Sequence, residues 1–321
     1  MGFGGWVLRV CLGTLAAPLL ASAASVLEVL PLTDRVVMVH FGEGRVIHSQ
    51  AGQPWGPESV LVSVLNTNTA SQTNSYQISS TNDPAYAAPL NPIQVGRKSK
   101  GTDFAWNGDP APRWTKEHWL YLKLPQAMQT GRNYTIDTGS LGSNGRQWPL
   151  TFDEKTARSE AVHVNLLGYV PGAPQKFAYV FHWAGDLGSL SLASYSGRTF
   201  RLIDQQSGAT AFSGALSFRK SATQTETGQA GDTPNANFLG AEVYECNFSS
   251  FNQPGQYIVA VDGIGCSFPF RINADIYREA FPPSRAAFTT TAAELPSGRR
   301  SPPLPARPRT TPPSRPDLPT D

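Results

Sequence analysis

The sequence has few charged residues and few cysteines, and each shortage excludes a class of protein. Only 16% of the 321 residues are charged, against roughly 25% in typical soluble domains. Lys and Arg exceed Asp and Glu by 26 − 24 = 2, so no strong positive field indicates nucleic acid and no basic run indicates a membrane surface. Three cysteines are too few for a small disulfide framework or a cysteine-rich zinc module.

Catalytic and cofactor motifs are also missing from the sequence. It contains no Gly-x-Ser-x-Gly elbow, no P-loop and no dinucleotide fingerprint. His40 and His48 flank a glycine turn without a Cys/His/Asp cluster at metal spacing, and His163 and His182 are expected to pack in or beside strands. We therefore predict no catalytic residue, no metal site and no cofactor.

Glycine and proline, in contrast, are abundant. The chain has 29 Gly and 27 Pro, which favours many turns and short strands over long helices. Its hydrophobic content of 40%, with 7 Trp, 10 Tyr and 16 Phe, is enough to form cores and excludes disorder along the whole chain.

The first 23 residues have the pattern of a secretory signal peptide. Arg9 is the only charge before Glu28, an apolar stretch follows it, and Ala21-Ser22-Ala23 supplies small residues at a cleavage site. The alternative is a membrane anchor, but the stretch is shorter than the ~20 residues needed to span a bilayer. We expect cleavage near Ala23, a secreted or periplasmic protein, and no membrane contact after cleavage.

Short apolar runs separated by turns predict an all-β chain with two consecutive antiparallel β-sandwiches. We place an N-terminal sandwich at residues 24–158 and a second, immunoglobulin-like sandwich at residues 159–274, because a charged, apolar-poor segment lies between them at residues 153–160. Residues 275–321 form a third part, and its residues 282–321 hold 11 of the 27 prolines and six Arg. This Pro/Arg/Thr-rich tail is expected to be disordered.

Two cysteines remain after the predicted cleavage. Cys246 and Cys266 lie in a stretch that reads as two successive strands of an exported protein. We predict a disulfide between them, which closes a loop of about 20 residues and contributes roughly 3 kcal/mol. The alternative is two buried free thiols.

Ordered motifs in the second sandwich resemble a known domain over about residues 161–278. Val164-Asn165-Leu166-Leu167-Gly168-Tyr169 is followed by Pro171 and by Ala173-Pro174-Gln175-Lys176, and later come Pro254-Gly255-Gln256-Tyr257 and Ser267-Phe268-Pro269-Phe270. These resemble the N-terminal immunoglobulin-like domain of glycoside hydrolase family 9 cellulases, although Leu166 stands where the family often has Gln.

The resemblance implies a downstream catalytic α/α-barrel that hydrolyses β-1,4-glucan with inversion, using a Glu acid and a base in an Asp-Ala-Gly-Asp motif. We expect this barrel, the domain's intramolecular partner, to be missing here. Trp183-Ala184-Gly185-Asp186 lacks the first Asp of that motif and is predicted to be a turn.

The tail offers an explanation for a missing barrel. With permitted codon choices, a shifted reading frame turns residues 288–298 and 305–317 into strings that resemble the start of the family's catalytic module. We therefore expect a frameshift in the gene or the assembly; the alternative is a genuine low-complexity linker. Ile272, Ile276, Tyr277 and Phe281 are expected to point toward the missing partner.

Two function classes follow from these observations. The first is the non-catalytic front part of a secreted family 9 glucanase, with β-glucan as the polysaccharide implied by the resemblance. The second is a free-standing carbohydrate-binding or adhesion protein made of two sandwiches. Trp106 and Trp114, in a loop-rich part of the first sandwich, are weak candidates for a sugar-stacking platform.

Overall fold

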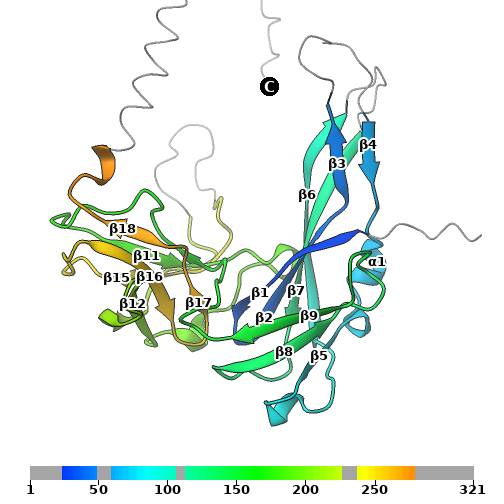
Figure 1. Ribbon diagram of the computed structural model, residues 1–321, viewed down its shortest axis with the longest axis horizontal. Helices are drawn as coiled ribbons and strands as arrows, with labels where there is room; N and C mark the ends of the chain where they lie inside the picture. The colour runs from blue at the N-terminus through cyan, green and yellow to red at the C-terminus, as the bar shows by residue number, and fades with distance from the viewer. Residues whose placement is uncertain (1–23, 49–58, 106–112, 226–236, 279–321) are drawn as a thin grey trace, which may run out of the picture. The chain divides into compact units, whose positions relative to one another are not determined.

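The computed structural model describes residues 24–48, 59–105, 113–225 and 237–278, and these form mainly antiparallel strands (Figure 1). The prediction of an all-β fold is confirmed. Among the residues described, no helix is both long and apolar enough to cross a membrane. The predicted signal peptide, Trp106, Phe281 and the Pro-rich tail lie outside the described residues.

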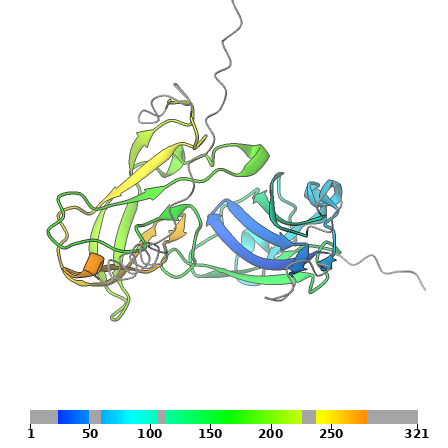
Figure 2. The same cartoon turned by 90° about the horizontal axis from the view of Figure 1, so that it is seen from above.

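The first sandwich has a four-stranded sheet with a three-stranded sheet opposite. The larger sheet has the order β1-β2-β7-β6 and contains Ser25–Thr33, Val36–Gly42, Arg113–Lys123 and Gln94–Ala105. Figure 2 shows β1 and β2 side by side in blue. The smaller sheet has the order β5-β8-β9 and contains Gln77–Ser80, Arg132–Asp137 and Gln147–Phe152.

Strand β2 is apolar on both faces, and the packing explains why. Val37, Val39 and Phe41 enter the core of the first sandwich, whereas Met38, on the other face, belongs to the core cluster of the second sandwich. Because successive side chains alternate across a sheet, a strand buried on both faces reads as a continuous apolar run.

Two small elements complete the first sandwich. Strands β3 (Gly44–Ile47) and β4 (Ser59–Val62) pair as a separate two-stranded sheet. The single-turn helix α1 (Thr67–Ala70) follows, and the side chain of Asn66 accepts a hydrogen bond from the Thr69 amide at 3.0 Å. This is an N-cap, which satisfies one of the amides left free at a helix start.

The second sandwich also has two antiparallel sheets. One has the order β10-β11-β15-β14, with strands Val162–His163, Phe177–Val180, Val243–Asn247 and Ser217–Lys220. The other has the order β13-β12-β16-β17, with strands Thr210–Ala215, Thr199–Asp204, Gly255–Val261 and Gly265–Cys266, and β18 (Phe270–Ile272) also pairs with β16. These two sheets confirm the prediction of a second antiparallel β-sandwich.

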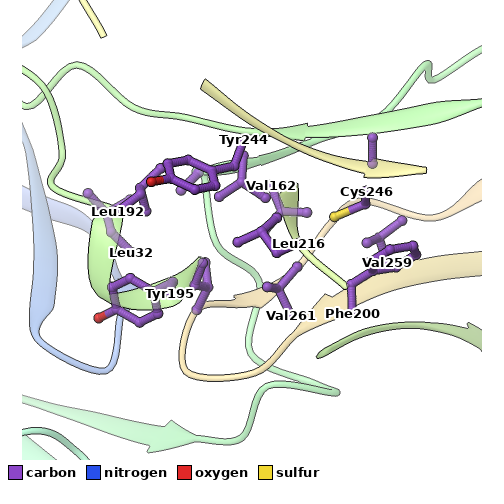
Figure 3. Close-up of a cluster of buried hydrophobic side chains, with 14 of the residues drawn as sticks. Leu32, Val162, Leu192, Tyr195, Phe200, Leu216, Tyr244, Cys246, Val259 and Val261 are labelled. Carbon is purple, nitrogen blue, oxygen red and sulfur yellow. The ribbon is translucent and has the colours of Figure 1, made fainter. Parts of the chain in front are cut away.

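The core of the second sandwich forms where the inner faces of these sheets meet. Figure 3 shows Phe200, Val259 and Val261 from one sheet opposite Tyr244 and Cys246 from the other. All five are nearly inaccessible to solvent. Burial of such side chains contributes about 1.5–3 kcal/mol each and is the main force that holds the two sheets together.

The predicted disulfide is wrong, because Cys246 and Cys266 are both buried free thiols. Cys246 points into the core between the sheets (Figure 3). Cys266 pairs with Ala260 and belongs to a separate cluster with Ile203 and Ile258 on the opposite face of its sheet. Two side chains separated by a sheet cannot meet the geometry of a disulfide. Burial raises the pKa of Cys266 to about 11 and also raises the pKa of Cys246.

One compact unit, ending at Ile276, contains both sandwiches. The hydroxyl of Tyr195 donates to Asp34 at 2.5 Å, and the hydroxyl of Ser159 donates to the Leu32 carbonyl at 2.8 Å. Leu32, Val36, Met38 and Tyr121 from the first sandwich belong to the same apolar cluster as the core of the second. Thus one face of the β1-β2-β7-β6 sheet is covered by the second sandwich.

The expectation that Ile272 and Ile276 point outward is also wrong. Both side chains are buried, at 1% and 2% exposure. Tyr169 forms an isolated bridge with Ile272, and a Cβ at Gly168 would lie 2.9 Å from the side chain of Ile276. The segment after β18 therefore folds back onto its own sandwich, because burying these two residues there removes apolar surface from water.

Candidate functional site

An exposed pair of aromatic rings lies on the β6–β7 hairpin. Trp114 and Phe104 occupy paired positions, their ring centroids are 5.1 Å apart, and both side chains are exposed, at 49% and 44%. The indole lies against the backbone of Gly101, where a Cβ would be 3.0 Å from the Trp114 ring. Glycine thus permits the close approach of the indole to the strand. The predicted sugar-stacking platform consisted of Trp106 and Trp114. Trp114 is part of this exposed aromatic pair, and Trp106 lies outside the described residues.

Two other tryptophans of the first sandwich have structural roles. The ring of Trp119 stacks on His40 at 4.4 Å, and the ammonium of Lys98 lies 4.6 Å from the Trp119 ring centre. The indole N–H of Trp148 donates to Thr138 at 3.2 Å. Partners already occupy these rings, so they offer less surface to a ligand than Trp114 does.

The histidines of the second sandwich are packing residues, as the sequence suggests. His163 stacks on Phe181 at 4.0 Å, and Nε2 of His182 lies 3.1 Å from the hydroxyl of Tyr121. Burial lowers the pKa of His163 and lowers the pKa of His182 to about 4. His182 is therefore neutral near pH 7 and contributes to the contact between the sandwiches.

The histidines of the first sandwich each contact one carboxylate. Nε2 of His40 lies 2.9 Å from Glu117, and Nε2 of His48 lies 2.8 Å from Asp103. The hydrogen bond from His48 lowers the pKa of the Asp103 carboxyl. Within the described ranges, no group of three or more His, Cys, Asp and Glu side chains could hold a metal ion.

Asp186, in the sequence that partly matches the Asp-Ala-Gly-Asp motif, lies in a turn. It belongs to the 3-10 helix Gly185–Leu187 and accepts a hydrogen bond from the backbone N–H of Arg97 at 2.6 Å. This carboxylate therefore joins the turn to β6. The structure places it in a contact between the sandwiches, as a structural group.

An apolar hollow of about 310 Å³ opens on the second sandwich, and no pattern in the sequence predicted it. Leu166 and Phe268 line it, with exposed fractions of 66% and 50%, and the guanidinium of Arg158 lies 4.7 Å from the Phe268 ring centre. The neighbouring Leu167 is also exposed. One feature of the sequence pointed to this hollow. Leu166 is apolar at a position where the family often has Gln, and the structure places it on the surface.

Lys176, the last residue of the first motif, is a fully buried cation. Its ammonium donates to the carbonyls of Pro171, Ala173 and Ser249 and to the side-chain oxygen of Asn252, at 2.8–3.0 Å. Burial lowers the pKa of this lysine. The four oxygens satisfy the ammonium and tie the loop before β11 to the loop after β15, which gives Lys176 a structural role.

A comparison with protein families identifies the second sandwich. Residues 157–266 match the family model described as the cellulase N-terminal Ig-like domain. A comparison with curated proteins found no match.

Similar solved structures include three glycoside hydrolase family 9 proteins, matched over part of the chain. A metagenome-derived family 9 endoglucanase is 22% identical over 37% of this chain and 18% of its own, with a TM-score of 0.28. A Bacteroides ovatus family 9 protein is 25% identical over 41% of this chain and 18% of its own, with a TM-score of 0.27. The family 9 endoglucanase J30 is 26% identical over 39% of this chain and 18% of its own, with a TM-score of 0.26.

The matched part of this chain thus spans less than a fifth of the length of those structures. The match of the family model and the order of the sequence motifs agree on the same part of the chain. The second sandwich is a member of the cellulase N-terminal Ig-like domain family.

Proposed function

We propose that this chain is the N-terminal part of a secreted family 9 glycoside hydrolase that acts on β-1,4-glucan, and that the chain itself does not hydrolyse glucan. The observation that carries the proposal is the family match of residues 157–266. In this arrangement the Ig-like domain supports a catalytic module that supplies the acid and base for inverting hydrolysis. We expect the gene to encode this module in a shifted frame downstream.

The apolar hollow beside Leu166 and Phe268 suits such a supporting role. Exposed apolar side chains that cluster on one face mark surfaces for association. The segment from Ile272 to Ile276 runs next to Gly168, so the chain leaves the sandwich beside Leu166 and Leu167. A following module would therefore begin next to this apolar face.

Sequencing the gene across codons 275–321 and the region downstream tests the proposal directly. The expected result is a shifted open frame that encodes the family's catalytic module, with an Asp-Ala-Gly-Asp motif and a Glu acid. A verified gene without such a frame would refute it.

If the frame exists, the joined protein allows a second test. Leu166→Asp should lower the melting temperature of the catalytic module, because it places a charge in the contact. Val64→Asp, at a residue 67% exposed in the first sandwich, is the control and should leave that temperature unchanged. Equal effects of the two substitutions would show that the hollow does not support the module.

Export is also part of this proposal. We expect the exported protein to begin near Ala24, which Edman sequencing of secreted material would test. A protein that keeps residues 1–23 and stays with the cell membrane would contradict it.

The exposed Trp114–Phe104 pair favours a second candidate function, which is carbohydrate binding. Aromatic rings exposed on a sheet can stack on the apolar faces of sugar rings. Trp114→Ala should release the chain from insoluble cellulose in a pull-down assay. Trp183→Ala removes another exposed tryptophan, 46% accessible, and is the control that should keep binding unchanged. If neither substitution alters retention, the aromatic pair is not a glucan site.

A further inference from the structure

A serine, a histidine and a glutamate form one hydrogen-bonded line in the first sandwich. Ser99 on β6 lies directly opposite His118 on β7. The Ser99 hydroxyl oxygen is 2.7 Å from Nδ1 of His118, and Nε2 of the same ring is 3.1 Å from a carboxylate oxygen of Glu43. Glu43 belongs to the segment between β2 and β3, so three separate parts of the chain build the line.

The surrounding donors and acceptors favour one direction for each proton. Arg97 donates to the Ser99 oxygen at 2.7 Å, which leaves the serine hydroxyl hydrogen free to point at Nδ1. Nδ1 then accepts, and the Nε2–H donates to Glu43. The Glu43 oxygen also accepts from the Leu65 amide at 3.1 Å, which holds the carboxylate in place. With a neutral imidazole and a Glu43 carboxylate that only accepts, the arrangement in which serine donates to histidine and histidine donates to glutamate gives every group a partner.

Burial divides the three residues into a hidden pair and an exposed serine. His118 and Glu43 are buried, at 2% and 5% exposure, whereas Ser99 is exposed. Burial is the main cause that lowers the pKa of His118. The imidazole is therefore neutral near pH 7 and can accept a proton, while Ser99 is an exposed residue on the surface of β6.

Two neighbouring features suit an acyl substrate. The Arg97 guanidinium donates to the serine oxygen, so its positive charge lies close to where the attacked carbonyl oxygen of a substrate would develop negative charge in acyl transfer. Its Nε is buried and has no hydrogen-bond partner among the described residues. The Trp114 ring lies over Gly101, two residues from Ser99 along β6 and roughly 7 Å away. A flat or apolar part of a substrate could rest on that ring.

We propose that Ser99, His118 and Glu43 form an acyl-transfer site for carboxylic esters, with Ser99 as the nucleophile. The Ser99 oxygen bonds to the ester carbonyl carbon while its proton passes to Nδ1 of His118. When the C–O bond to the alcohol breaks, that proton leaves His118 with the departing alcohol oxygen. Water then attacks the carbonyl carbon of the acyl-serine and gives one proton to His118. When the bond between that carbon and the Ser99 oxygen breaks, His118 returns the proton to the Ser99 oxygen and the acid is released.

Glu43 acts through His118 as a positioning residue. It holds the Nε2–H tautomer and stabilises the imidazolium that forms. In this ring, Nδ1 faces the nucleophile and Nε2 faces the carboxylate, and either nitrogen can carry the proton. The activity does not depend on the proposed glucanase role, so either proposal can fail alone.

A fluorophosphonate probe tests the nucleophile in the full unmodified chain. It should attach to one serine, and a chymotryptic map should find the label in the peptide covering residues 91–104. A chain that stays unlabelled, or a label elsewhere, would overturn the proposal. This measurement needs no variant and is unaffected by any folding defect.

Hydrolysis of p-nitrophenyl acetate tests the mechanism. Ser99→Ala and His118→Gln should each lower the rate about 100-fold or more, in the range of a lost nucleophile or general base. Glu43→Gln should lower kcat with little change in KM. Ser217→Ala, which removes an exposed strand serine of the second sandwich, is the control and should keep the full rate. Equal rates for Ser99→Ala and Ser217→Ala would refute the site.

Discussion

Replacing Gly185 with alanine should strongly destabilise the contact between the two sandwiches. Gly185 has a φ of +64°, and a Cβ there would lie 2.2 Å from the carbonyl oxygen of Arg97. That distance is more than 1 Å shorter than an ordinary contact, so the turn must move away from β6. The matched control is Gly208→Ala, because Gly208 has a similar φ of +69° but nothing within 4 Å of its Cβ position.

The expected cost is the sum of two effects. A positive φ costs an alanine about 1–2 kcal/mol at either position. At Gly185 the movement also breaks the hydrogen bond from Arg97 N–H to the Asp186 carboxylate, 2.6 Å long, and a bond to a charged group contributes about 1.5–3 kcal/mol. We therefore expect a loss of about 4 kcal/mol for Gly185→Ala and about 1 kcal/mol for Gly208→Ala.

Urea unfolding followed by tryptophan fluorescence measures the difference, and hydrogen exchange locates it. With a slope of about 2 kcal/mol/M, the two midpoints should differ by roughly 1.5 M. The Arg97 amide should lose its protection only in Gly185→Ala. If both variants unfold within about 0.3 M of each other, the turn does not press against β6 as the structure shows.

Three further predictions concern buried groups of the second sandwich. Lys176→Met should lower the free energy of unfolding by about 3 kcal/mol, because it leaves four buried oxygens without their donor. The control Lys155→Met, at an exposed site, should change it by under about 0.5 kcal/mol. Equal urea midpoints for the two variants would contradict this prediction. Folding lowers the pKa of His182 from 6.5 to about 4, so the unfolded chain binds more protons than the folded chain between these pH values. The free energy of unfolding should therefore fall by about 3 kcal/mol as the pH is lowered from 6.5 to 4. His182→Gln should flatten that slope in melting curves, and an unchanged slope would refute the assignment. Alkylation of the unfolded, non-reduced protein should modify both Cys246 and Cys266, and a disulfide-linked peptide would contradict the structure.

The local sequence pattern was sufficient to predict the fold class and the family of the second sandwich. Apolar runs separated by Gly and Pro turns predict short strands, since these residues limit the length of any regular element. The motif from Val164 to Lys176 is contiguous in the chain, so the sequence displays it directly. The structure adds that Lys176 is held by oxygens from two loops, one of which lies more than 70 residues further along.

Only the tertiary structure decided which face of a strand each residue occupies. Cys246 and Cys266 both lie in predicted strands, yet one points into the core and the other lies on the far face of the opposite sheet. The alternation of side chains has a period of two, so a shift of one residue in register exchanges the faces. Register depends on partner strands distant in sequence, and the spacing of two cysteines carries no information about it.

The dependence on distant partner strands also explains which residues the sequence placed wrongly and which it did not reveal. Ile272 and Ile276 are buried because the chain turns back beside Gly168, and Ser99, His118 and Glu43 meet only because β6 pairs with β7 while Glu43 follows β2. Composition and local motifs determined that this chain forms two strand-rich sandwiches and that the second belongs to a cellulase-associated domain family. Strand pairing over long sequence separations decided which side chains meet, because such contacts depend on the folded register and leave no periodic signal in either partner segment.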